Sequence, residues 1–141
     1  MLKVSGKRGA LAIADEGRLI TTLREMHFSL TIGERTYKIS RRGLFSPTYE
    51  LRRESDLVVS AQQAPFVNRF AVKYGDKVWT LKAVGLTAKK FALLLGDSQV
   101  GAISPTSYNP YRETIVDLPS EMPVEAQVFL IWIVARRWGS D

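Results

Sequence analysis

The feature that most constrains the fold is an apolar segment, VEAQVFLIWIVARRW, at residues 124–138. Within it, Val128 to Ala135 are eight consecutive apolar residues. Eight residues make more than two helical turns, so a helix here is apolar on every side and must be enclosed by protein or by lipid. Such a helix is about 22 Å long at 1.5 Å per residue, whereas the hydrocarbon core of a bilayer is about 30 Å thick. We therefore expect protein, not lipid, to surround this helix.

Turn-forming residues mark both ends of the expected helix. Pro119 and Pro123 precede it, Ser120 is a candidate N-cap, and Gly139 follows it. Proline is tolerated in the first turn because the N–H that it lacks has no partner there, and glycine commonly follows the last turn. The pattern predicts one α-helix over Val124–Trp138.

The residues before this helix have the alternation of apolar and polar side chains that is typical of half-buried strands. FSLTI at 28–32 and RFAVKYGDKVWTLKA at 69–83 are the clearest examples. Gly75-Asp76 and Gly96-Asp97 suit two-residue hairpin turns, because glycine accepts a positive φ at no steric cost. We expect about a dozen strands of ordinary length, near 2–5, 10–14, 18–24, 28–32, 35–40, 47–53, 56–62, 67–74, 77–84, 88–95, 98–104 and 111–117.

A sheet of so many short antiparallel strands leaves unpaired edges unless it closes into a barrel. A barrel of about twelve strands has an interior that strand side chains alone do not fill, and the apolar helix would fill it. We predict an all-β fold with one helix: a closed antiparallel β-barrel of about twelve strands that encloses Val124–Trp138, as a single domain over residues 1–141. A β-sandwich with a flanking helix is the main alternative, and a membrane-spanning helix ranks below it.

The segment LPSEMPVEAQVFLIWIVARRW at 118–138, after strands VWTLKA and KKFALLLGDSQVGAI, resembles the tubby-like C-terminal superfamily. This superfamily includes tubby proteins, phospholipid scramblases and LURP-one-related proteins, and the chain is most similar to the small LURP-one-related and scramblase-like members. The resemblance covers essentially the whole chain and implies a twelve-stranded barrel threaded by a hydrophobic helix. It also implies binding of phosphoinositides through surface lysines and arginines, without assigning them residue by residue. A cysteine- or proline-rich N-terminal segment and an acidic calcium loop are missing, so calcium-driven scrambling is not implied.

Residues that could carry catalysis or bind a metal are scarce. The chain has no cysteine, and His27 is its one histidine. Multi-histidine and thiolate metal sites are thereby excluded, and we interpret His27 as a polar residue at the start of the 28–32 strand. GKRG at 6–9 is not followed by the serine or threonine of a phosphate loop, so a basic turn explains it better. We expect no catalytic residue, metal or cofactor, although folding could still pair two carboxylates.

The charge balance points to anionic partners. The formal net charge is +6, which attracts phosphates or serves solubility alone. If Gly75-Asp76 is a two-residue turn, Arg69 faces Lys82 on the outer surface. If Gly85-Leu86-Thr87 forms the next turn, Lys82 also faces Lys90. The sequence therefore predicts a basic row of Arg69, Lys82 and Lys90 that either binds an anion or is simply solvated.

These observations favour a non-enzymatic module that binds anionic lipid headgroups, or a protein at a membrane surface. A soluble interaction or scaffold domain without a lipid role is the alternative. Nucleic-acid binding ranks lower, because the one strong helix is expected to be buried. Residues 10–14 are too short an apolar run for a signal peptide, so we expect a cytoplasmic protein, peripheral to the membrane.

Overall fold

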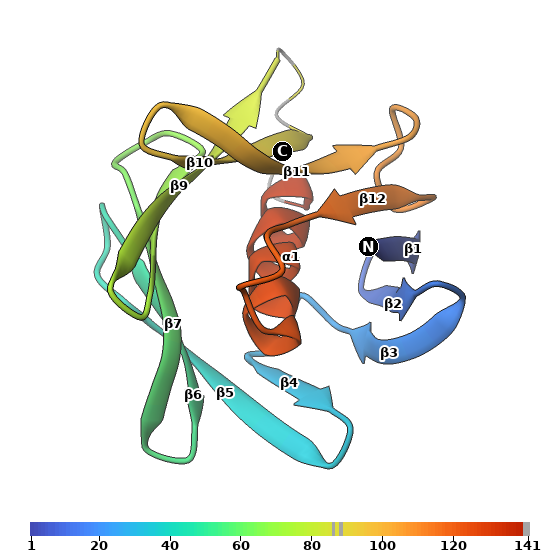
Figure 1. The fold of residues 1–141 in the computed structure, drawn as a ribbon, viewed down its shortest axis with the longest axis horizontal. Helices are drawn as coiled ribbons and strands as arrows, with labels where there is room; N and C mark the ends of the chain where they lie inside the picture. The colour runs from blue at the N-terminus through green and yellow to red at the C-terminus, as the bar shows by residue number, and fades with distance from the viewer. Residues whose placement is uncertain (86, 88, 140–141) are drawn as a thin grey trace.

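The computed structural model describes residues 1–85, 87 and 89–139. It confirms an all-β fold with a single C-terminal helix (Figure 1). The elements are β1 (Leu2–Lys7), β2 (Ala10–Asp15), β3 (Arg18–Leu23), β4 (Ser29–Ile32), β5 (Arg35–Arg42), β6 (Thr48–Arg53), β7 (Asp56–Gln63), β8 (Arg69–Tyr74), β9 (Lys77–Val84), β10 (Lys90–Leu95), β11 (Ser98–Pro105), β12 (Thr114–Asp117) and α1 (Val124–Trp138).

The strands form one antiparallel sheet that curls into a nearly closed barrel around α1 (Figure 1). Consecutive strands pair with one another except β3 and β4, and β1 also pairs with β12. In the described part of the chain, β3 and β4 are the two edge strands. The Thr21 hydroxyl donates to the carbonyl of Thr31 across this seam.

The helix α1 is buried on all sides, as predicted. Ala126, every residue from Val128 to Ala135, and Trp138 are buried. The helix begins after Pro123, which is the N-cap residue and makes no side-chain cap hydrogen bond. The expectation that Ser120 caps the helix was therefore wrong. None of the described helices is long and apolar enough to cross a membrane.

The strand side chains that point inward complete the core around α1. Phe70, Trp79 and Phe91 are almost fully buried, as the alternation of apolar residues predicts. On β8 and β9 the predicted register is confirmed, with Phe70 opposite Leu81 and Val72 opposite Trp79. Because side chains alternate along a strand, this register sends the polar residues between them to the outer surface.

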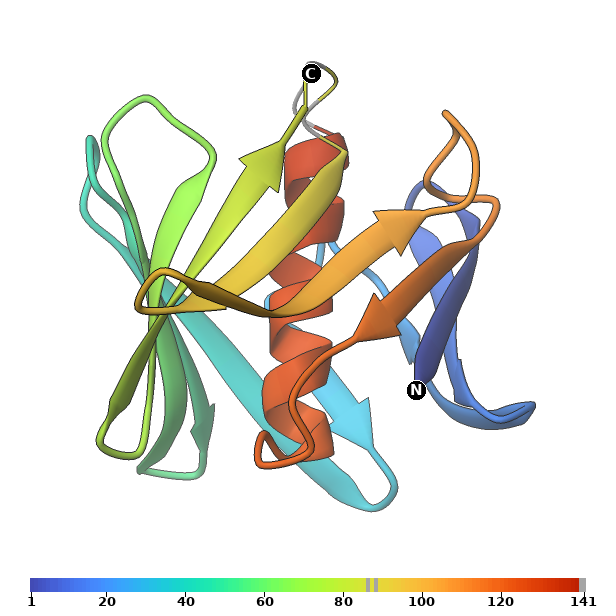
Figure 2. The ribbon, with the colours of Figure 1, turned by 45° about the horizontal axis from the view of Figure 1, so that its top comes forward.

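The two ends of the barrel differ in the connections that they carry. At the end where α1 begins, five two-residue turns join consecutive strands, at 16–17, 33–34, 54–55, 75–76 and 96–97. At the other end, where α1 finishes, the connections include the longer loops 24–28, 43–47, 64–68 and 106–113. In Figure 2 the C-terminus lies at the top, and loops 43–47 and 64–68 reach the same upper side of the molecule. We call these the helix N-terminal end and the helix C-terminal end.

Candidate binding surface at the helix C-terminal end

Acidic side chains gather at the helix N-terminal end of the barrel. Each of the five two-residue turns contains one: Glu16, Glu34, Glu54, Asp76 and Asp97. The segment that leads into α1 and its first turn add Glu121 and Glu125. Arg18, Arg35, Arg53 and Lys77 adjoin four of these turns, but the carboxylates outnumber them, which makes this end less favourable for an anionic partner.

The connections at the helix C-terminal end carry or adjoin mainly cations. These are Lys7, Arg8, Arg24, Arg42, Arg69, Lys89, Lys90 and Arg112. Among the described residues, the carboxylates in these connections are Glu25 and Glu113. Glu25 is buried and accepts a hydrogen bond from the Gly9 amide at 2.7 Å, and Glu113 lies 3.6 Å from the ammonium of Lys3. The fold thus sorts a modest net charge into an acidic end and a basic end.

Arg69 and Lys82 occupy directly opposed positions on β8 and β9, as the sequence predicts. Arg69 is exposed and Lys82 is partly exposed on the outer face. Within the described residues, neither forms an ion pair with a carboxylate. Like charges opposite one another destabilise a sheet, so an anion between these two side chains would remove an unfavourable interaction.

Lys90 does not complete the predicted row. It pairs with Val84, while Ala92 lies opposite Lys82. The prediction was wrong because it assumed a three-residue turn at 85–87, whereas the strands end at Val84 and resume at Lys90. Leu86, within that predicted turn, lies outside the described residues. Lys90 lies on the same face of the sheet as Ala92 but two positions earlier in β10.

Two open hollows adjoin Arg69. The first has a volume of about 310 Å³, and Ser46, Gln62 and Thr80 are among its lining residues. The second has a volume of about 410 Å³ and is lined in part by Phe66, Asn68 and Lys82. Arg69 lines both hollows, so a group that enters either of them lies beside this residue.

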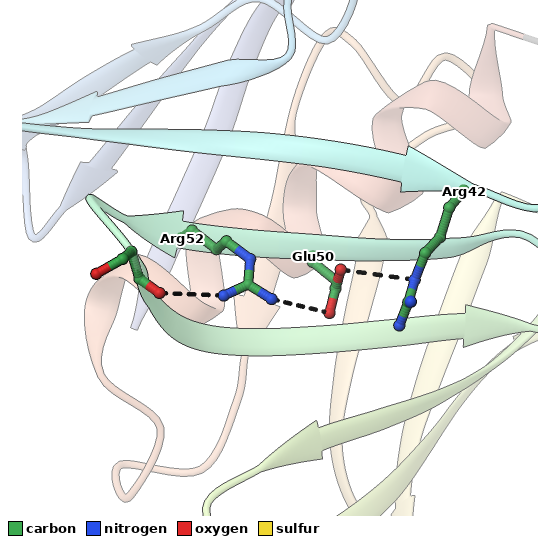
Figure 3. A network of polar contacts seen from close by, with 4 residues as sticks. Arg42, Glu50 and Arg52 are labelled. Carbon is green, nitrogen blue, oxygen red and sulfur yellow. Dashed lines mark hydrogen bonds and ion pairs between the residues drawn. The ribbon is translucent and has the colours of Figure 1, made fainter.

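A second basic cluster on the outer face differs because it contains its own carboxylate (Figure 3). Glu50 lies 3.6 Å from Nε of Arg42 and 3.4 Å from Nη2 of Arg52. The side chain of Glu50 is only 13% exposed, so both arginines are held against it. Arg52 also donates to the carbonyl of Ser55 at 3.1 Å. Because these arginines already have anionic or carbonyl partners, Arg69 and Lys82 are the better candidates for an external anion.

The arginines at the end of α1 join the helix to the surrounding loops. Arg136 donates to the carbonyl of Glu25 at 2.8 Å and lies over the rings of Phe28 and Trp132 at 4.7 and 4.8 Å. Arg137 donates from Nε to Oδ1 of Asn68 at 2.6 Å. Both arginines therefore hold the loops of the helix C-terminal end in place.

The same end exposes large apolar side chains that the sequence analysis missed. Leu44 and Phe45 project from loop 43–47, and Phe66 and Val67 from loop 64–68. The signal was present in the sequence, since GLFSP and APFVN each place apolar residues among turn-forming residues. Sequence alone did not indicate that these two loops lie side by side, which the contact between Phe45 and Phe66 shows.

The other polar features singled out from the sequence, His27 and the GKRG segment, form hydrogen bonds that hold the fold together. His27 lies in the loop before β4, and its carbonyl accepts a hydrogen bond from the indole of Trp132 at 2.8 Å. GKRG forms the basic turn that was predicted, in which Arg8 donates to the carbonyl of Gly139 at 2.7 Å. The described part of the chain contains no group of three or more potential metal ligands.

Comparison with known proteins gives no match to a family model, a curated protein or a solved structure.

Proposed function

We propose that this protein is a non-enzymatic module that binds the phosphate-bearing headgroups of anionic lipids at the cytoplasmic surface of a membrane. One observation carries the proposal: Arg69 and Lys82 are directly opposed on the outer face and, among the described residues, have no carboxylate partner. A phosphate between them would be attracted to both side chains and would screen their mutual repulsion.

Two further features support this function. The acidic turns lie at the opposite end, so the basic end would face an anionic surface while the acidic end points away from it. The resemblance to the tubby-like superfamily also implies phosphoinositide binding, and the barrel around α1 has the architecture that this resemblance implies. We therefore also propose that the chain is related to that superfamily.

Co-sedimentation with lipid vesicles tests the proposal. We expect the protein to bind vesicles of equal parts phosphatidylcholine and phosphatidylserine and not vesicles of phosphatidylcholine alone. The double variant Arg69→Gln with Lys82→Gln should bind about 30-fold more weakly, because each basic residue near an anionic bilayer contributes about 1 kcal/mol.

A matched control separates a local site from general charge attraction. Lys38→Gln with Lys73→Gln removes the same charge from exposed positions on β5 and β8, and should retain nearly all binding. An equal loss in both double variants would show that net charge alone drives binding. Absence of any binding at low ionic strength would refute the lipid function outright.

A further inference from the structure

Two neighbouring loops form an exposed apolar projection at the helix C-terminal end. Leu44, Phe45, Phe66 and Val67 are 82%, 71%, 86% and 49% exposed, and we call these four residues the apolar tip. The rings of Phe45 and Phe66 lie 6.2 Å apart between centroids, so the two loops present one continuous surface. Single exposed apolar residues are ordinary, but a cluster of large ones marks an interaction site.

Hydrogen bonds hold both loops in position. The Ser46 hydroxyl donates to the carbonyl of Gln63 at 2.6 Å, and the Gln63 amide donates to the carbonyl of Pro47 at 2.9 Å. The side chain of Gln63 donates to the carbonyl of Val67 at 3.0 Å. The loops are thus joined to one another before any partner arrives, which lowers the entropic cost of binding.

The backbone at Phe66 is unfavourable for its side chain. Its φ is +62°, in the left-handed region that bulky residues rarely adopt. The side chain is too exposed for burial within the barrel to offset this cost. Strained residues that do not serve packing occur preferentially at functional sites, so both the strain and the exposure of Phe66 point to a role in binding.

Cations border the apolar tip on both sides. Arg42 immediately precedes loop 43–47, and Arg69 immediately follows loop 64–68. The tip residues Phe66 and Val67 line the same hollow as Arg69 and Lys82. An anionic bilayer has the matching order of layers, with hydrocarbon at depth and phosphates just above it.

From this arrangement we infer that the apolar tip inserts into the acyl region of an anionic bilayer while Arg69 and Lys82 contact headgroup phosphates above it. The inference rests on the proposed lipid-binding function and adds a mode of binding to it. The barrel would approach the membrane with its helix C-terminal end, and the acidic turns would remain in water.

The test compares two double variants on phosphatidylcholine–phosphatidylserine vesicles. In the tip variant, Phe45→Ser with Phe66→Asn, asparagine tolerates the left-handed backbone at position 66, so the barrel should fold. Its thermal unfolding midpoint and circular dichroism should match those of the unsubstituted protein. The control, Leu19→Ser with Leu57→Ser, removes apolar side chains that are 62% and 49% exposed and that lie beside turns of the opposite end.

We expect the tip variant to bind more weakly by about a hundredfold or more, because it lacks two aromatic side chains that insertion would bury, and the control to bind normally. This deficit should persist at high salt, whereas the deficit of the Arg69→Gln, Lys82→Gln variant should shrink as salt screens the charges. That difference in salt dependence is the signature of insertion.

Three results would overturn the inference, and they differ in what they say of the proposed function. A tip variant that binds like the unsubstituted protein would leave headgroup binding intact and exclude insertion. Equal losses of vesicle binding in the tip variant and the Leu19–Leu57 control would exclude a specific role for the helix C-terminal end in membrane binding. A dimer in light scattering that the tip substitutions convert to a monomer, without vesicle binding by either form, would make the tip a protein interface and refute both proposals.

Discussion

Arg137 and Asn68 connect the last turn of the central helix to a loop on the barrel rim. Nε of the arginine donates to Oδ1 of the asparagine at 2.6 Å, although the two residues are 69 positions apart in the chain. The amide of Ala83 donates to the carbonyl of Asn68 at 2.9 Å, which joins the same loop to β9. Asn68 therefore anchors the loop that contains Phe66 to the helix and to β9.

Replacing Asn68 with alanine should loosen loop 64–68 without unfolding the barrel. The variant loses a hydrogen bond to a charged group, which contributes about 1.5–3 kcal/mol to the free energy of unfolding. We expect faster amide hydrogen exchange in residues 64–68 and unchanged protection of α1, measured by mass spectrometry.

Asn109 provides the control for this experiment, because its Oδ1 accepts a hydrogen bond from the Tyr111 amide in a different loop of the same end. Asn109→Ala should accelerate exchange in loop 106–113 and leave loop 64–68 unchanged. If Asn68→Ala exchanged no faster in its own loop, the connection to Arg137 would have no ordering effect.

The core position of α1 predicts a strong response to a buried charge. Ile131 is fully buried in the middle of the helix. Ile131→Asp should prevent stable folding, because an unpaired buried charge costs several kcal/mol and whole domains are stable by only about 5–15 kcal/mol. Ile131→Val should remain folded and lose about 0.5–1.5 kcal/mol in urea denaturation. A stable Asp variant would contradict the enclosed position of the helix.

The ion pair between Lys77 and Glu121 predicts a small dependence of stability on pH. Their charged atoms are 2.6 Å apart, and the hydrogen bond to Glu121 raises the pKa of Lys77 above its ordinary value of 10.5, with the negative charge of Glu121 acting in the same direction. A raised folded-state pKa stabilises the protein below the unfolded-state pKa, and this effect disappears as pH rises through the folded-state value.

Lys77→Gln should accordingly unfold at a slightly lower denaturant concentration at neutral pH. The difference from the unsubstituted protein should vanish at alkaline pH, above the raised pKa of Lys77, where both proteins lack this charge. Denaturation at the two pH values measures it. Because the pair is exposed to solvent, a large difference at neutral pH would indicate a role other than this ion pair.

Much of the architecture could be predicted from the sequence because it depends on local patterns. The alternation around Gly75-Asp76 determines both the turn and the register of β8 against β9, and it places Arg69 opposite Lys82. The eight consecutive apolar residues of α1 had to be buried by other parts of the protein, and the preceding strands were the segments that could surround them. Both inferences use periodicity and turn chemistry, which act over a few residues.

The errors arose where position depends on longer connections. The composition of the five-residue link between Val84 and Lys90 does not show where the two strands end. Lys90 was therefore predicted opposite Lys82, a position that Ala92 occupies. The apolar tip was missed because it combines loops 43–47 and 64–68, which β6 and β7 separate in the chain. Their proximity follows from the barrel, not from any local pattern.

The position of the core helix has a consequence for synthesis on the ribosome. All twelve strands precede α1 in the chain, yet inward residues as early as Val4 belong to the same core as Ile131. Emerging strands have nothing to close around until residues 124–138 have also emerged, and exposed strand edges favour aggregation in the meantime. Because the strands and the helix share one core, that core can be completed only after residues 124–138 have left the ribosome.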